Sequence, residues 1–334
     1  MNRTAIAFAL AALSAGAAHA QSSVTVYGAV DLGLVLERGG AAGSVNKLSS
    51  GVEAGSRLGF KGTEDLGCGL SAKFVLEMGI SADNGSLNQG GTAFGRQSLV
   101  GLSGGFGSVT MGRQYTPLFL ALDSVDPFGT GLAGASTNLF AFYPTSGNAR
   151  MTNSVIYTSP AMSGFSGMLA YGFGEVPGNS SAKRQIGASL SYESGPWLLT
   201  VAHHSTNNAT GSDSERTTLA GAVFDFGMAK VHVVYDRNRG LAGVDNSDAL
   251  IGVSAPVAGG TLMASYIRKT DKSGLKQNAS QAAIGFTYPI SKRTNFYTAY
   301  GRIDNDNGAT YTVGNAIDSG TGDKAFNLGI RHKF

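Results

Sequence analysis

The sequence predicts an all-β protein, a 16-stranded antiparallel transmembrane β-barrel. Residues 325–334 (AFNLGIRHKF) alternate between two faces without a break and end in Phe334, as expected of a strand that closes a barrel. After residue 20 there is no run of 18 or more apolar residues, so a membrane span must be built from strands. The 49 glycines beside 42% hydrophobic residues fit many short strands joined by turns.

Residues 1–20 are expected to form a secretory signal peptide. Arg3 gives this segment a positive start, an apolar stretch follows, and a small-residue cleavage site ends at Ala20. The mature chain is therefore expected to begin at Gln21 and to form a single β-barrel domain over residues 21–334.

Segments with a period of two, bounded by Gly, Pro, Asn, Asp and Ser, mark the expected strands. They lie at residues 24–36, 52–63, 69–79, 93–103, 106–114, 150–159, 163–174, 184–193, 196–206, 216–226, 228–238, 246–255, 259–269, 280–289, 292–303 and 323–334. Their connections alternate between tight turns and longer polar stretches such as 304–322. An even strand count puts both termini on the periplasmic side, with the short turns there and the long loops outside.

The two faces of the expected strands differ in polarity. Ala282, Ile284 and Phe286 share one face of their strand, while charged and small polar side chains occupy the opposite face of others. Apolar side chains outside and polar ones inside predict a wet interior, and 16 strands enclose more space than side chains fill. All eight prolines fall in or beside connections, because proline cannot donate to a strand ladder.

The connection at residues 115–149 is expected to be a constriction loop. Its apolar side chains are too many for an exposed loop: Leu118, Phe119, Leu120, Leu122, Phe128, Leu139, Phe140 and Phe142. Long loops are usually functional or disordered, and this composition argues against disorder. Folded inward, the loop would bury these groups on the barrel wall and narrow the channel.

Basic side chains are expected to line this constriction. Arg57, Arg96 and Arg150 lie on the second, fourth and sixth expected strands, and alternate strands are roughly 10 Å apart, so the three guanidinium groups form a ladder. Arginine stays ionised and its fork suits carboxylate and phosphate, and rings of like charge select ions. The basic side chains expected to extend the patch are Lys61, Lys73 and Arg113.

Two carboxylates of the loop, Asp123 and Asp126, are expected to face the arginines across the constriction. A second interpretation stays open, because aspartate also caps helical turns and precedes proline in turns, as Asp126 does here.

No pattern in the chain indicates chemistry. His203 and His204 are neighbours on one expected strand and point to opposite faces. There is no nucleophile elbow in a credible setting and no phosphate loop. The formal net charge of +3 is too near balance to indicate a nucleic-acid partner. Cys68 is the only cysteine, which excludes an intramolecular disulfide. We therefore expect no catalytic residue, metal or cofactor, and no enzyme.

Six features carry a resemblance to a known family. They are SVTVYG at 23–28, SRLGFKGTEDL at 56–66, FGRQ at 94–97, MGRQ at 111–114, NSVIYTSP at 153–160 and the terminal Phe334. Taken together, they make residues 21–334 resemble the general, non-specific porins of Gram-negative outer membranes, of the beta-proteobacterial type.

The resemblance implies a homotrimer in the outer membrane, among its lipid and lipopolysaccharide, with one pore in each subunit and the third loop folded inward. It also implies passive diffusion of small hydrophilic solutes and ions. Arg57, Arg96 and Arg150 look like the basic ladder of anion-selective relatives, so a weak preference for anions is expected. Phe334 resembles the signal that the barrel-assembly machinery reads.

Three alternatives remain open. A substrate-specific outer-membrane channel belongs to the same structural class. An outer-membrane barrel enzyme, such as a lipase, requires serine, histidine and an orienting polar group on one patch. An extracellular β-sheet adhesin or binding protein would not partition into the outer membrane.

Overall fold

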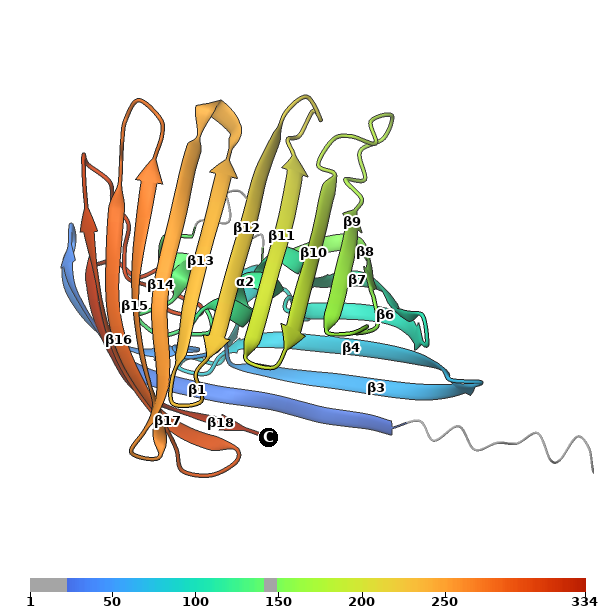
Figure 1. The fold of residues 1–334 in the computed structure, drawn as a ribbon, viewed down its shortest axis with the longest axis horizontal. Helices are drawn as coiled ribbons and strands as arrows, with labels where there is room; N and C mark the ends of the chain where they lie inside the picture. Colours follow the sequence, from blue (N-terminus) through green and yellow to red (C-terminus); the bar gives the residue numbers. More distant parts are fainter. Residues whose placement is uncertain (1–22, 141–148) are drawn as a thin grey trace, which may run out of the picture.

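The structure, a computed structural model, describes residues 23–140 and 149–334. The expected signal peptide at 1–20 and Phe142 of the constriction loop lie outside the described residues. Across the described part of the chain, the strands form a closed antiparallel barrel of 16 strands (Figure 1), which confirms the predicted fold class. No helix among the described residues is both long and apolar enough to cross a membrane.

The strands are β1 (Ser23–Gly40), β2 (Gly43–Ser50), β3 (Arg57–Gly67), β4 (Leu70–Ser81), β5 (Ser86–Leu87), β6 (Gln97–Gly104), β7 (Gly107–Tyr115), β8 (Arg150–Thr158), β9 (Phe165–Gly172), β10 (Gln185–Ser194), β11 (Trp197–Asn207), β12 (Ser214–Asp225), β13 (Lys230–Arg239), β14 (Asp245–Val257), β15 (Gly260–Asp271), β16 (Ala279–Pro289), β17 (Thr294–Asn305) and β18 (Lys324–Lys333). The helices are α2 (Pro117–Val125) and the short 3-10 turns η1 (Gln89–Gly91), η2 (Ser136–Asn138) and η3 (Leu241–Gly243). β2 and β3 occupy successive parts of one barrel strand, because β1 pairs with both.

The last strand closes the barrel against the first, as the sequence predicts. β18 pairs with β1 in an antiparallel ladder in which Ala29 lies opposite Lys333. The backbone N–H groups of Gly28 and Phe334 each donate to the other residue's carbonyl oxygen, at 3.0 and 3.1 Å. Closure satisfies the hydrogen-bonding groups that an open edge would leave exposed to lipid.

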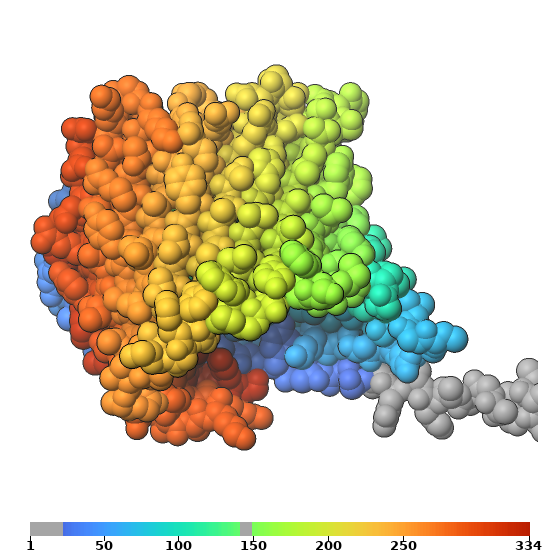
Figure 2. Space-filling view, in the orientation of Figure 1, coloured from blue at the N-terminus to red at the C-terminus, as the bar shows by residue number. Residues whose placement is uncertain are grey.

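The outer face of the wall is apolar. Figure 2 shows this face as a continuous surface across the strands between β10 and β16, coloured from green to orange. Exposed side chains in this region include Val233, Tyr235, Ile251, Tyr266 and Ile284. The alternation of apolar and polar faces along the strands is therefore the one that a lipid surface requires.

Most connections follow the predicted alternation of length. Figure 1 shows strands β10 to β15 upright, with tight turns at their lower ends and larger connections above. The first connection differs, because it is a two-residue turn at 41–42. β1 continues to Gly40 and offers an unpaired edge, and Gly43–Ser50 pairs with that edge instead of forming a loop.

The strand expected at 52–63 is interrupted at its beginning, since residues 51–56 leave the ladder between β2 and β3. The buried carboxylate of Asp31 accepts hydrogen bonds from the backbone N–H groups of Glu53 and Ala54, at 2.9 and 2.7 Å. The hydroxyl of Tyr297 donates to the same carboxylate at 2.6 Å. A side chain from β1 thus replaces the missing strand partner, and the interrupted segment turns into the lumen.

The constriction loop folds inward, which confirms the prediction. α2 begins after Thr116, whose side-chain oxygen accepts a hydrogen bond from the N–H of Phe119 at 3.1 Å. Leu118, Leu122 and Val125 recur at helical spacing and are fully buried where α2 meets β10, β11, β12 and β13. Figure 1 shows α2 inside the barrel, behind β11 and β12.

Glycines on the wall make room for this loop. A Cβ atom at Gly221 would lie 2.8 Å from a methyl carbon of Val125, and one at Gly252 would lie 2.7 Å from a ring carbon of Pro127. Any larger side chain at these positions would force the loop away from the wall and into the channel.

A second connection, the last loop at residues 306–323, also enters the barrel mouth. The N–H of Gly314 donates to the side-chain oxygen of Asn138 at 3.0 Å, which joins this loop to the constriction loop. Lys47 of β2 forms an ion pair with Asp318. The polar composition of this loop suggested an external loop, but these contacts hold its tip over the channel.

Candidate functional site

A cavity of about 1230 Å³ lies inside the barrel between the wall and the two inward loops. The charged side chains that line it are Glu53, Arg57, Lys61, Glu77, Arg96, Asp123, Arg150, Arg331 and Lys333. The larger apolar side chains that line it include Phe119, Leu120, Phe128, Leu132, Met263 and Ile317.

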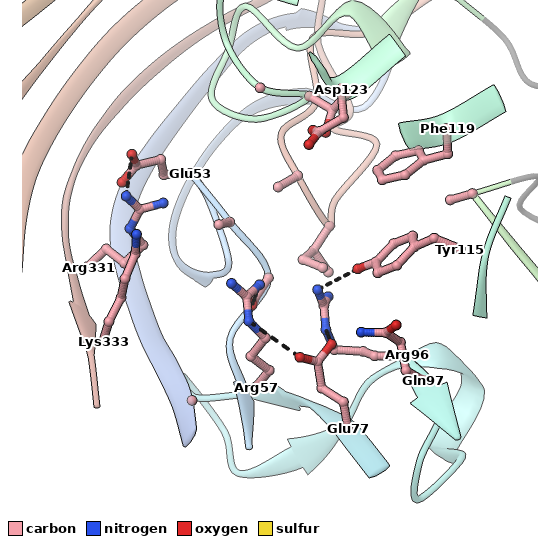
Figure 3. A pocket seen from close by; sticks show the side chains of 18 of the residues that line it. Glu53, Arg57, Glu77, Arg96, Gln97, Tyr115, Phe119, Asp123, Arg331 and Lys333 are labelled. Atoms are coloured by element: carbon pink, nitrogen blue, oxygen red, sulfur yellow. Dashed lines mark hydrogen bonds and ion pairs between the residues drawn. The ribbon is translucent and has the colours of Figure 1, made fainter. Parts of the chain in front are cut away.

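The three predicted arginines meet in one network, and Figure 3 shows the part of it around Arg57 and Arg96. Glu77 of β4 accepts from Nε of Arg96 at 2.7 Å, and Nε of Arg57 lies 3.8 Å from the same carboxylate. The hydroxyl oxygen of Tyr115 accepts from Arg96 and from Arg150, both at 2.7 Å. The Arg150 guanidinium also lies 4.4 Å from the centroid of the Tyr115 ring. The ladder is therefore continuous, and a glutamate and a tyrosine hold its spacing.

The other predicted basic residues lie at different places. Lys61 lines the cavity, with its ammonium 5.1 Å from the centroid of the Tyr27 ring. Arg113 is outside the lining and donates from Nε to the carbonyl oxygen of Gly95 at 2.7 Å. It thereby holds the segment that leads into Arg96. Lys73 is also outside the lining.

The two predicted carboxylates have different environments. Asp123 lines the cavity and accepts a hydrogen bond from the hydroxyl of Thr130 at 2.8 Å. Asp126 is buried and accepts from the backbone N–H groups of Phe128, Thr130 and Ser136, at 2.9, 3.1 and 3.0 Å. Asp126 thus holds the turn after α2, which is the second of the two interpretations left open above.

Several lining residues were not among the predicted site residues. Alternation along the last strand places Arg331 and Lys333 on its channel-facing side, and both line the cavity. Glu77 lies on the polar face of β4, where alternation was the same signal. Glu53 pairs with Arg331 at 3.1 Å. No local pattern marks Glu53, because it reaches the cavity only through the interruption between β2 and β3.

The balance of charge in the cavity is positive. Counting side chains alone, six lining residues are cationic and three are anionic. Field lines concentrate in a narrow aqueous passage with low-dielectric walls, so an excess of one sign enriches counter-ions there.

His203, His204 and Cys68 lie outside the residues that line the cavity. Within residues 23–140 and 149–334, no group of three His, Cys, Asp or Glu side chains is placed to hold a metal ion. His203 is exposed and hydrogen-bonds to Thr218 at 2.8 Å, while its neighbour His204 is buried on the other face. Cys68 is exposed in the turn between β3 and β4.

Comparison with known proteins agrees with this geometry. A family model described as Gram-negative porin matches residues 5–308. Outer membrane porin protein 32 of Delftia acidovorans is 33% identical, and an outer membrane porin protein of Bordetella pertussis is 30% identical, with all of each chain covered.

Solved structures show the same fold. The anion-selective porin from Comamonas acidovorans is 30% identical and superposes with a TM-score of 0.80, over 94% of this chain and 100% of that one. OmpT of Vibrio cholerae in its trimer form is 16% identical and shares the fold with a TM-score of 0.68, over 94% of this chain and 99% of that one. The chain therefore belongs to the Gram-negative porin family and forms a channel in the outer membrane.

Proposed function

We propose that this porin passes small hydrophilic solutes and ions by passive diffusion, with a weak preference for anions. One observation carries the proposal: cationic side chains outnumber anionic ones by six to three around the constriction cavity. The arginines of the ladder stay ionised at any physiological pH. The relative from Comamonas acidovorans, which is described as anion-selective, supports the same direction.

The reversal potential of single channels in a KCl gradient tests this proposal. One uncompensated charge at about 6 Å in a water-like medium is worth about 0.7 kcal/mol, or roughly threefold in local anion concentration. We expect a reversal potential of anion sign at low salt. The preference should weaken near 1 M salt, where the screening length falls to about 3 Å. A reversal potential of cation sign contradicts the proposal.

The anion preference is also expected to rise as the pH falls. The loop partly desolvates the Asp123 carboxylate and raises its pKa; the hydrogen bond from Thr130 opposes this shift, and the charge of Asp126 adds to it. A raised pKa means that Asp123 loses its negative charge at a higher pH than an ordinary aspartate, whose pKa is about 3.9. Each neutralised Asp123 leaves the cavity more positive.

Reversal potentials measured over a series of pH values check this expectation. Asp123→Asn should show the higher anion preference already at neutral pH. It should also lose the pH dependence that the unaltered channel shows at pH values above the titration range of an ordinary aspartate. Asp306→Asn, which removes an exposed carboxylate of the last loop outside the cavity lining, serves as the matched control. An unchanged pH profile in Asp123→Asn removes Asp123 from the selectivity mechanism.

We further propose that the protein assembles as a homotrimer, surrounded by outer-membrane lipid and lipopolysaccharide, and has no enzymatic activity. The apolar outer wall and the trimer form of the Vibrio cholerae relative support this assembly. The terminal Phe334, whose backbone pairs with Gly28 at the seam, is proposed as the signal for the barrel-assembly machinery. Electrophoresis of unheated and heated protein tests the trimer, and ester hydrolysis assays test the absence of lipase activity.

A further inference from the structure

Two large aliphatic side chains are exposed inside the cavity. Leu120 of α2 is 39% exposed and Ile317 of the last loop is 37% exposed, and both belong to the cavity lining. The same two loops otherwise bury their aliphatic residues, since Leu118, Leu122 and Val313 are fully buried. A single exposed aliphatic residue needs no explanation. Here two aliphatic residues from different loops each present apolar surface to the same charged cavity.

Ile317 is held firmly beside the arginine ladder. Cβ atoms built on Gly51 and Gly55 would lie 2.6 and 2.7 Å from carbons of the Ile317 side chain, so this side chain packs directly on the interrupted wall segment. The Cβ built on Gly55 would also lie 2.7 Å from Nη1 of Arg96. Asn315 accepts a hydrogen bond from the N–H of Ile317 at 3.0 Å. An aliphatic group and a guanidinium group therefore meet at one fixed point.

Arg57 offers a guanidinium to the cavity at the same place. Its side chain is 25% exposed, its Nε lies 3.8 Å from the Glu77 carboxylate, and its Nη1 makes a long bond of 3.3 Å to the carbonyl oxygen of Gly55. Figure 3 shows Arg57 and Arg96 extending into the cavity, with Phe119 on the side of α2. The cavity thus presents a cationic side and an apolar side to one solute.

We propose that the cavity favours organic anions with an apolar body over compact hydrophilic anions of equal charge, the preferred class being aromatic monocarboxylates. This inference rests on the anion preference proposed above and adds Leu120 and Ile317 as specificity-determining residues. The carboxylate accepts from the guanidinium group of Arg57, which is the more exposed of the two, while the ring packs against aliphatic surface of the lining and releases water from it. Acetate can make only the contact with arginine, and benzyl alcohol can make only the contact with the aliphatic side chains.

Block of the single-channel KCl current by benzoate and by acetate tests the inference. Benzoate is expected to half-block at a concentration roughly three- to fivefold lower than acetate, the factor that corresponds to burial of about one methylene. Leu120→Asn and Ile317→Asn should each bring the value for benzoate toward that for acetate, while the potassium-to-chloride reversal potential keeps its anion sign. Leu275→Asn alters a 69% exposed leucine outside the cavity and should change neither value.

The outcomes separate this inference from the proposed function. Equal block by benzoate and acetate in the unaltered protein, with a KCl reversal potential of anion sign, overturns the inference and leaves the proposed function standing. A KCl reversal potential of cation sign overturns the proposed function. Block by benzyl alcohol as strong as block by benzoate also overturns the inference, because it would show that the contact between carboxylate and arginine contributes nothing to the block. If Ile317→Asn does not insert, Ile317→Thr removes the same apolar surface with a smaller change of shape, and undiminished benzoate block in that variant overturns the inference.

Discussion

Replacement of Arg57, Arg96 and Arg150 together with glutamine is expected to abolish the anion preference of the channel. The substitutions leave three cationic and three anionic side chains around the cavity, where there are now six and three. With each charge worth roughly threefold in local anion concentration at about 6 Å, the loss amounts to up to about 30-fold before screening. Salt reduces this factor, so the effect is largest well below 0.1 M.

The reversal potential in a dilute KCl gradient measures this loss, and two further variants control it. Arg302→Gln removes an exposed arginine that pairs with Asp304 outside the cavity, so selectivity should be unchanged. Glu77→Gln removes the carboxylate that the ladder shares and should shift the reversal potential further toward the anion value. A triple variant that keeps the original reversal potential excludes the ladder as the source of selectivity.

The barrel could be predicted because lipid imposes one simple pattern on every strand. Side chains alternate with a period of two, and the first and last strands of a closed barrel must pair, so the pairing was predictable and the structure adds its register, with Ala29 opposite Lys333. The interruption at residues 51–56 could not be predicted in this way. It exists because the buried carboxylate of Asp31, on the neighbouring strand, provides the hydrogen bonds that a ladder would otherwise supply.

The site residues on strands could be predicted from two properties: which face of the strand a side chain occupies (its phase) and how far along the strand it lies (its depth). Phase and depth place Arg57, Arg96 and Arg150 on one wall, and the structure joins them through Glu77 and Tyr115.

Strand phase could not predict which loop residues face the channel, because loops do not alternate with a period of two. An aspartate before a proline serves equally well as a pore carboxylate or as a turn, and only the three N–H groups around Asp126 decide for the turn. The entry of the last loop depends on Lys47 and Asn138, which are distant in sequence.

Replacement of Lys269 with methionine is expected to destabilise the barrel strongly and to loosen the constriction loop. Lys269 of β15 is fully buried, with 0% of its side chain exposed. Its ammonium donates to both carboxylate oxygens of Asp248 at 3.0 Å and to the carbonyl oxygen of Leu139 in the constriction loop at 2.8 Å. The buried carboxylate of Asp236 accepts from the backbone N–H of Asp248 at 3.1 Å. The Asp248 carboxylate and Leu139 of the constriction loop therefore depend on one cation.

Without that cation, the buried carboxylate of Asp248 loses its ion-pair partner, and the free energy of unfolding should fall by about 3–5 kcal/mol. Guanidinium-induced unfolding of the detergent-solubilised protein measures this change. Because Leu139 loses its hydrogen bond as well, single-channel recordings should show more frequent conductance fluctuations than the unaltered protein.

The neighbouring residue provides the matched control. Arg268 pairs with Asp306 at 3.2 Å, but these side chains are 43% and 49% exposed, so Arg268→Met should cost no more than about 1 kcal/mol. Lys269→Met combined with Asp248→Asn removes one unpaired charge along with the cation and should recover much of the lost stability. Equal losses in Lys269→Met and Arg268→Met would show that burial gives the Lys269 pair no special weight.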